Sequence, residues 1–179
     1  MNQPLSPEEI AKEAKRAYDR GEFTEAAHLY KASAQGYASR DDALGSAEML
    51  NNCSVAYVRA GDGEAAFQAV DGTPAIFAAA GDIRRQGIAL GNLGAALEAL
   101  KKKMEAEEAY LQSADLLFQA GEGELRAQVM QSLSALQLRG GRHFEAVASM
   151  QSGMQSMPKK GIKQKILSGL LKFQSRFLG

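Results

Sequence analysis

Small residues recur along the chain at an interval of 40 residues, each time within a helical pattern of apolar positions. One recurring position is always small and holds Ala14, Ser54, Gly94 and Ser134. Another is always alanine and holds Ala26, Ala66, Ala106 and Ala146. Between these two positions stands glycine or lysine, at Gly21, Gly61, Lys101 and Gly141. A repeat of this length with a break in its middle is typical of stacked helical hairpins.

The pattern predicts an all-α solenoid that forms a single domain over residues 1–179. Four helix-turn-helix repeats are expected over about residues 7–40, 42–80, 82–121 and 122–158. Each hairpin exposes an apolar face that it cannot cover alone, so stacking the hairpins builds a continuous core. The alanine position is expected where two helices cross closely, because a larger side chain would overpack such a crossing.

Two local signals refine these limits. Ser6, Pro7 and Glu9 form a helix start, in which Ser6 caps the first turn and Glu9 completes a capping box. Pro74 has no backbone N–H to donate, so the second helix of the second hairpin should break near residue 71 and resume at Pro74. The break is interpreted as a kink that the repeat tolerates, with a hinge or a binding notch as the alternatives.

A further helix is predicted over about residues 161–177, after Pro158. Its apolar residues follow helical spacing and are Ile162, Ile166, Leu170, Phe173 and Phe177. One interpretation is a C-terminal capping helix that covers the last apolar face of the stack. A second is a basic amphipathic helix that associates with an anionic membrane surface or a partner. Self-association through the same face is a third.

Residues 90–114 resemble the tetratricopeptide repeat. The resemblance is carried by Leu93-Gly94, Glu105-Ala106, Tyr110 and Ser113-Ala114, and it extends over about residues 7–158. The chain departs from the family pattern because it has no tryptophan and because its period is 40 rather than about 34 residues. It is similar to the long-repeat variant that is found in adaptors and motor light chains. The resemblance implies a right-handed α–α superhelix and a non-enzymatic scaffold for protein–protein interaction.

The resemblance also implies a concave groove, lined by the first helix of each hairpin, that binds an extended peptide of a partner protein. The groove residues that it implies are Lys15, Tyr18, Asn51, Asn52, Arg59, Asn92, Glu98, Gln128, Gln131 and Arg139. Asn52 and Asn92 occupy the position at which long-repeat relatives hold a peptide backbone, a task that suits an amide because it donates and accepts. The alternative is that these two amides satisfy neighbouring helices. Only Asn52 matches the family's carboxylate-clamp positions, so a co-chaperone of that type is not expected.

The distribution of charge limits the classes of partner. The chain has 21 acidic and 21 basic residues, which leaves no general excess of cations for nucleic acid. Every acidic residue lies at or before Glu145, whereas six basic residues follow it. No apolar run is long enough to cross a bilayer, and the single cysteine excludes an intrachain disulfide. We therefore expect a cytoplasmic protein with protein or peptide partners, and membrane contact only through the alternative given above.

Residues for catalysis or metal binding are sparse. His28 and His143 stand at different positions of the repeat, so neither a metal site nor a cofactor is predicted. Cys53 stands where later hairpins have Leu93 and Leu133, which favours a buried core thiol over a nucleophile. No glycine-rich phosphate loop follows a predicted strand. No catalytic residue is assigned, and the chain is expected not to be an enzyme.

Overall fold

The structure, a computed structural model, describes residues 5–157, and this part of the chain contains nine α-helices and no strand. The helices are α1 (Pro7–Asp19), α2 (Phe23–Ala38), α3 (Ala43–Ala60), α4 (Gly63–Val70), α5 (Thr73–Ala79), α6 (Ile83–Ala99), α7 (Lys103–Gln119), α8 (Gly123–Arg139) and α9 (His143–Gln155). The prediction of an all-α repeat is confirmed. The helix predicted over about residues 161–177 lies outside the described residues.

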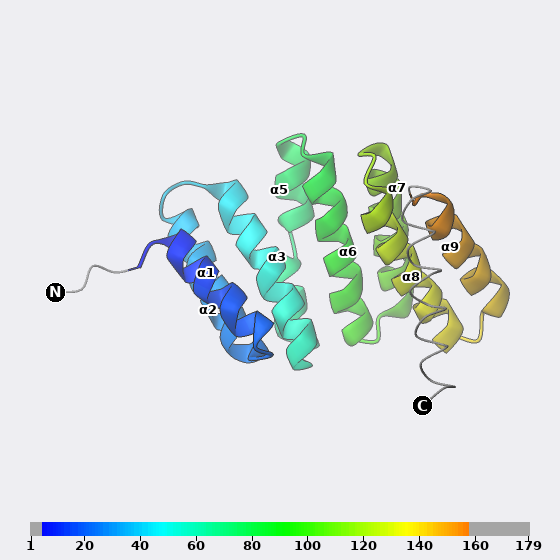
Figure 1. The fold of residues 1–179 in the computed structure, drawn as a ribbon, viewed down its shortest axis with the longest axis horizontal. Coiled ribbons are helices and arrows are strands. Elements are labelled where there is room, and N and C mark those ends of the chain that lie inside the picture. The colour runs from blue at the N-terminus through cyan, green and yellow to red at the C-terminus, as the bar shows by residue number, and fades with distance from the viewer. Residues whose placement is uncertain (1–4, 158–179) are drawn as a thin grey trace, which may run out of the picture.

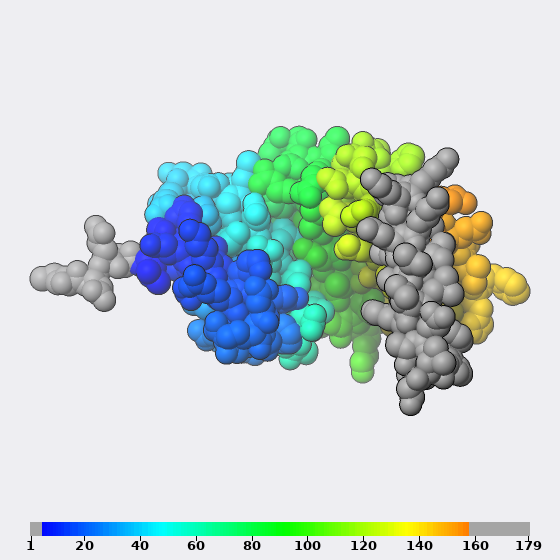
Figure 2. All heavy atoms as spheres, viewed as in Figure 1, coloured from blue at the N-terminus to red at the C-terminus, as the bar shows by residue number. Residues whose placement is uncertain are grey.

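The helices pack as hairpins in chain order, each against the next (Figure 1). The first helices of the four hairpins are α1, α3, α6 and α8, and the second helices are α2, the α4–α5 pair, α7 and α9. The space-filling view shows the same order as successive bands of colour along the surface (Figure 2). Each hairpin therefore contacts mainly its neighbours in sequence, as expected of a solenoid.

The small positions lie where helices cross. Ala26, Ala66, Ala106 and Ala146 are each at most 1% exposed, which confirms their predicted burial. At the other small position, a Cβ on Gly94 would lie 2.7 Å from the Tyr110 ring, and Ser134 Oγ donates to the carbonyl of Ala146 at 2.7 Å. Both contacts join the two helices of one hairpin, so the side chain at this position sets how closely the helices approach.

Cores between hairpins join the stack into one unit. Tyr30 and Cys53 share a cluster that connects α2 with α3, Val70 and Ala96 connect α4 with α6, and Tyr110 packs with α8. Cys53 is fully buried, its thiol donates to the carbonyl of Ala27 at 3.3 Å, and burial raises its pKa to about 11. The prediction of a core thiol is confirmed.

The start of α1 and the break in the second hairpin are both confirmed. The Glu9 N–H donates to Ser6 Oγ at 3.2 Å, and the Ser6 N–H donates to the Glu9 carboxylate at 2.8 Å. The helix α4 ends at Val70, and α5 begins at Thr73 with Pro74 in its first turn, where no backbone donor is needed. Between them Gly72 has a φ of 82°, a left-handed conformation that glycine adopts without strain.

Lys101 stands in the turn position that is glycine in the other three hairpins. Gly21, Gly61 and Gly141 have φ angles of 82°, 83° and 77°, and Lys101 has a φ of 63°. A lysine there costs roughly 1–2 kcal/mol, which exceeds the roughly 0.5–1 kcal/mol that glycine loses through its freedom in the unfolded chain. Lys101→Gly is therefore expected to raise the free energy of unfolding in urea by roughly 0.5 kcal/mol.

Lys101→Ala is the control for this substitution, because it removes the same charge and keeps the Cβ. An equal gain with alanine would show that charge, and not backbone conformation, determines the stability at this turn.

Candidate functional site

A cavity of about 170 Å³ opens between α3, α5 and α6. Its lining residues are Glu48, Asn51, Asn52, Phe77, Arg84, Arg85, Ile88 and Asn92. Three of the groove residues implied by the resemblance, Asn51, Asn52 and Asn92, meet at this cavity. The cavity lies where α5, the helix that follows the break after α4, approaches both α3 and α6. The break therefore contributes to the site.

The asparagine amides form a chain of hydrogen bonds across three helices. Asn51 is 5% exposed, and its Nδ2 donates to the carbonyl of Ala47 at 3.0 Å and to Thr73 Oγ1 at 3.2 Å. Asn92 Nδ2 donates to Asn51 Oδ1 at 3.2 Å. The Thr73 hydroxyl donates to the carbonyl of Val70 at 2.9 Å. Asn51 therefore holds α3, α5 and α6 together, and its amide is used inside the protein.

Asn52 differs from Asn51 and Asn92, the two asparagines of this network. It is half-buried at the cavity, and within residues 5–157 its amide makes no hydrogen bond. Asn92 hydrogen-bonds to Asn51 on the neighbouring helix α3. The alternative interpretation expected this internal role of both Asn52 and Asn92. Of the two matched asparagines, Asn52 is the one whose donor and acceptor remain available to a bound chain.

Each charged residue that lines the cavity is paired, with another lining residue or with a carboxylate outside the cavity. Arg85 Nε donates to Asp82 at 2.6 Å, its Nη1 lies 3.4 Å from the Glu48 carboxylate, and its guanidinium lies 5.1 Å from the centre of the Phe77 ring. Arg84 pairs with Glu122 at 2.5 Å. The pKa of Asp82 is lowered, first by the hydrogen bond from the Arg85 N–H and then by the Arg85 side chain. The site is therefore polar without a free excess of either charge.

Sequence reasoning missed five residues of this cavity: Glu48, Phe77, Arg84, Arg85 and Ile88. A signal existed for two of them. Glu48 and Ile88 lie one helical turn before Asn52 and Asn92, so they share the face of those asparagines. No such signal existed for Phe77, because it reaches the cavity only through the turn at Gly72.

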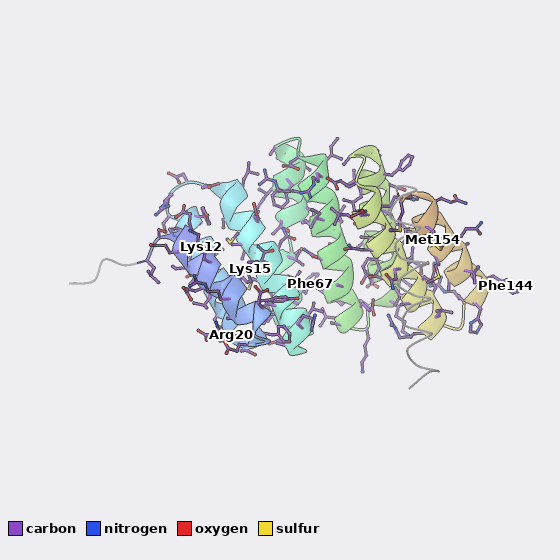
Figure 3. The ribbon with its side chains drawn as sticks, in the orientation of Figure 1. Lys12, Lys15, Arg20, Phe67, Phe144 and Met154 are labelled. Carbon is purple, nitrogen blue, oxygen red and sulfur yellow. The ribbon has the colours of Figure 1, made fainter. Side chains whose placement is uncertain are left out.

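The N-terminal groove residues lie on the first two hairpins, away from the cavity. Lys15 pairs with Asp19 at 2.6 Å, and Figure 3 labels Lys15 with Lys12 on α1. The Tyr18 ring packs edge-on against the Phe23 ring with 5.2 Å between centroids. The Arg59 guanidinium lies 4.6 Å from the centre of the Phe23 ring. Phe23 thus links the first helices of two hairpins.

The C-terminal groove residues lie on α6 and α8, also outside the cavity. Glu98 accepts from the Tyr110 hydroxyl at 3.1 Å and forms an ion pair with Arg139, whereas Gln128 and Gln131 are exposed. Burial, and next the charge of Glu98, raises the pKa of Tyr110. This group connects the third and fourth hairpins.

A larger depression of about 710 Å³ lies between the start of α7 and the turn from α8 to α9. Met104, which is 83% exposed, Leu111 and Leu136 form its apolar part. Its Glu107 accepts from Gln137 at 3.0 Å and pairs with Arg142, whose hydrogen bond holds the pKa of this carboxyl below its usual range. Sequence reasoning did not predict this depression, and the positions of its polar groups do not select a ligand.

Residues 5–157 hold no cluster of three or more His, Cys, Asp or Glu side chains placed to bind a metal ion. None of the nine helices is both long enough and apolar enough to cross a membrane.

By sequence, the chain matches no protein-family model and no curated protein. Similar solved structures do exist. One is a Podosopora anserina protein described as a putative kinesin light chain with nearly identical TPR-like repeats. It is 18% identical to this chain with a TM-score of 0.69, and the match covers 82% of this chain and 72% of the other. A single-residue variant of that protein has a TM-score of 0.70 at 18% identity and covers 86% and 76% of the two chains.

A third similar structure is MamA from Desulfovibrio magneticus RS-1, from residue 41 to its end. It is 16% identical with a TM-score of 0.62, and the match covers 84% of this chain and 75% of the MamA chain. All three matches extend over most of the nine helices. The chain therefore has the TPR-like helical-repeat fold that the resemblance of its sequence implied.

Proposed function

We propose that this chain is a non-enzymatic scaffold for protein–protein interaction, and that it holds an extended segment of a partner protein along its first helices. In this proposal Asn52 hydrogen-bonds the backbone of the bound segment, and the cavity between α3, α5 and α6 accepts one of its side chains. The half-buried Asn52 amide, next to two amides that are used internally, is the observation that carries the proposal.

The size of the cavity favours a peptide over a small molecule. Sites for cofactors and drug-sized ligands usually enclose roughly 300–1,000 Å³, whereas this cavity encloses about 170 Å³. A space of that size suits a single side chain. The apolar wall formed by Ile88 and Phe77, beside the paired charges of Arg85 and Glu48, suits a side chain with an apolar body.

The proposal includes a cytoplasmic location. Cys53 is a free, buried thiol, which is compatible with a reducing compartment. Fluorescence microscopy of the tagged chain in its own cells tests this part, and a signal confined to another compartment would contradict it.

Binding is tested with linear peptides selected on the wild-type chain from an unbiased displayed library. Asn52→Ala is expected to weaken the selected peptides roughly tenfold, because a hydrogen bond in a desolvated contact is worth about 1–1.5 kcal/mol. Titration calorimetry measures the affinity, and a thermal melt recorded by circular dichroism should be nearly unchanged, since Asn52 makes no internal hydrogen bond within residues 5–157.

Asn52→Ala with Asn92→Ala should weaken binding further. This double variant should also lose some stability, because the loss of Asn92 leaves the buried oxygen of Asn51 without its donor. Gln112→Ala is the matched control, since this exposed amide lies on α7 and donates to Glu108 of its own helix. Equal affinities for wild type, Asn52→Ala and Gln112→Ala would remove the role proposed for Asn52.

A further inference from the structure

The turn of the third hairpin holds a lysine where the repeat favours glycine. Lys101 has a φ of 63°, at the position of Gly21, Gly61 and Gly141 in the other three hairpins. A left-handed backbone disfavours any residue with a Cβ, so the packing of the repeat alone would select glycine here as well. Residues that persist in a strained conformation are concentrated at functional sites. Lys101 is therefore a candidate for a function at this turn.

Lys101 begins a run of exposed lysines that lack ionic partners. Lys101, Lys102 and Lys103 are all exposed, and within residues 5–157 none of them forms an ion pair, whereas most other basic residues of that range do. The Lys102 ammonium lies 5.3 Å from the centre of the Phe67 ring on α4, so the run extends from α4 to the start of α7. This turn presents positive charge that no ion pair of the described residues uses.

The same turn borders the depression of about 710 Å³ between α7 and the turn from α8 to α9. Met104 and Leu111 line it and are 83% and 46% exposed. Stacking of the hairpins does not require apolar side chains at these two positions, because the first two hairpins hold polar residues there. Exposed apolar side chains that gather around a depression typically mark an interaction site. The polar equivalents are Thr24 and Glu64 for Met104, and Lys31 and Asp71 for Leu111.

We propose that this surface, the lysine-turn site, docks an acidic segment of a second partner protein. The site is defined by Lys101, Lys102, Lys103, Met104 and Leu111. An apolar side chain of the segment enters the depression beside Met104 and Leu111, and carboxylates on one side of that anchor pair with the lysines. The polar groups inside the depression do not select a ligand, and the unpaired lysines next to it supply the selection through charge complementarity.

Two carboxylates of α7 limit which segment fits. Glu105 and Glu108 line the depression, are exposed and lie further along the helix than the lysines, whereas Glu107 is paired with Arg142. Like charges placed opposite Glu105 and Glu108 are unfavourable. The segment should therefore carry its acidic residues on only one side of its apolar anchor. The same repulsion disfavours nucleic acid and an anionic membrane, because their phosphates would cover both ends of the site.

The lysine-turn site is separate from the proposed groove. The groove follows the first helices, and its cavity lies between α3, α5 and α6. The lysine-turn site lies on α7, a second helix, and on the turn before it, at the end of α6 (Figure 1). Two partners can therefore be held at the same time, one in the groove and one at the lysine-turn site. Neither contact depends on the other.

Lys101→Gly with Met104→Thr tests the site with residues that other hairpins already use at these positions. This double variant should fold with a stability close to that of the wild type, because glycine relieves the turn and Thr24 is the first hairpin's equivalent of Met104. Linear peptides are selected from an unbiased displayed library on the Asn52→Ala chain, which disfavours groove binders. In titration calorimetry the double variant should bind the selected acidic peptides roughly tenfold more weakly than the wild type, because an ion pair and an apolar contact are lost.

Lys31→Gln with Phe118→Ala is the matched control, because it removes one exposed lysine and one exposed apolar side chain elsewhere. This control should bind the same peptides as tightly as the wild type. Added salt should weaken the wild type more than the double variant, since exposed ion pairs are screened. A selection that yields no peptide sensitive to the double variant, or only sensitive peptides without acidic residues, would overturn the proposal. Either outcome leaves the groove proposal intact, because that proposal depends on Asn52.

Short single-stranded DNA and phosphatidylserine vesicles are the probes for a phosphate-bearing partner. In low salt, neither should bind the wild type more tightly than the Lys101→Gly, Met104→Thr variant. Binding of either probe that this variant abolishes would assign the lysines to a phosphate surface and would overturn the proposal of an acidic protein segment.

Discussion

Replacing Leu133 with alanine is expected to lower the free energy of unfolding by about 3 kcal/mol, within the range of roughly 2–5 kcal/mol for buried leucines. Leu133 is fully buried on α8 and packs with Tyr110 and Met130 between the third and fourth hairpins. The close-packed surroundings cannot collapse fully around alanine, so the cost includes a cavity as well as the lost burial. Urea unfolding followed by circular dichroism measures the change.

Leu138→Ala is the matched control for this substitution. Leu138 lies on the same helix and is 48% exposed, so its truncation should cost well below about 1 kcal/mol. Because stability in a solenoid is a sum over neighbouring hairpins, Leu133→Ala should loosen the fourth hairpin before the first. Hydrogen exchange should therefore accelerate in α8 and α9 more than in α1 and α2. Similar losses for the two leucines would contradict the assignment of Leu133 to the core between hairpins.

The repeat could be predicted from sequence because identical offsets encode identical packing. Ala106 recurs as alanine since a neighbouring helix presses on it, and a pattern of that kind needs no knowledge of the partner helix. The break near residue 71 was also predictable, because Pro74 cannot donate a backbone hydrogen bond. These inferences depend on local chemistry that repeats or on a residue with a single strong effect.

The site was predicted less completely for a physical reason. Asn51 was placed on the groove face by its position on the first helix, but α5 packs over it and leaves it 5% exposed. That outcome depends on the direction in which the chain leaves Gly72, and a period derived from unbroken helices carries no information about that direction. The same turn brings Phe77 to the cavity. The break between α4 and α5 therefore gives the cavity its buried Asn51 and its Phe77 wall.

Phe77→Ala is expected to have the second large effect, lowering the free energy of unfolding by about 3–5 kcal/mol. Phe77 is 1% exposed and packs with Ala47 of α3 and Ala89 of α6, so its ring holds α5 against both first helices. Its loss also removes the surface on which the Arg85 guanidinium lies, at 5.1 Å from the ring centre. Urea unfolding measures the loss of stability, and the remaining folded protein can be titrated with selected peptides at low temperature.

Phe118→Ala separates burial from the contact between arginine and ring. Phe118 is 67% exposed, yet the Arg126 guanidinium lies 5.3 Å from the centre of its ring, nearly the same arrangement as at Phe77. Its truncation should cost only about 0.5–1 kcal/mol, the worth of an exposed cation–π contact, and peptide affinity should not change. Phe77→Ala should instead weaken peptide binding, because the cavity of about 170 Å³ loses one of its walls. If the two variants lost equal stability and neither changed affinity, α5 would be only a tolerated irregularity, and the site would have to lie elsewhere on the first helices.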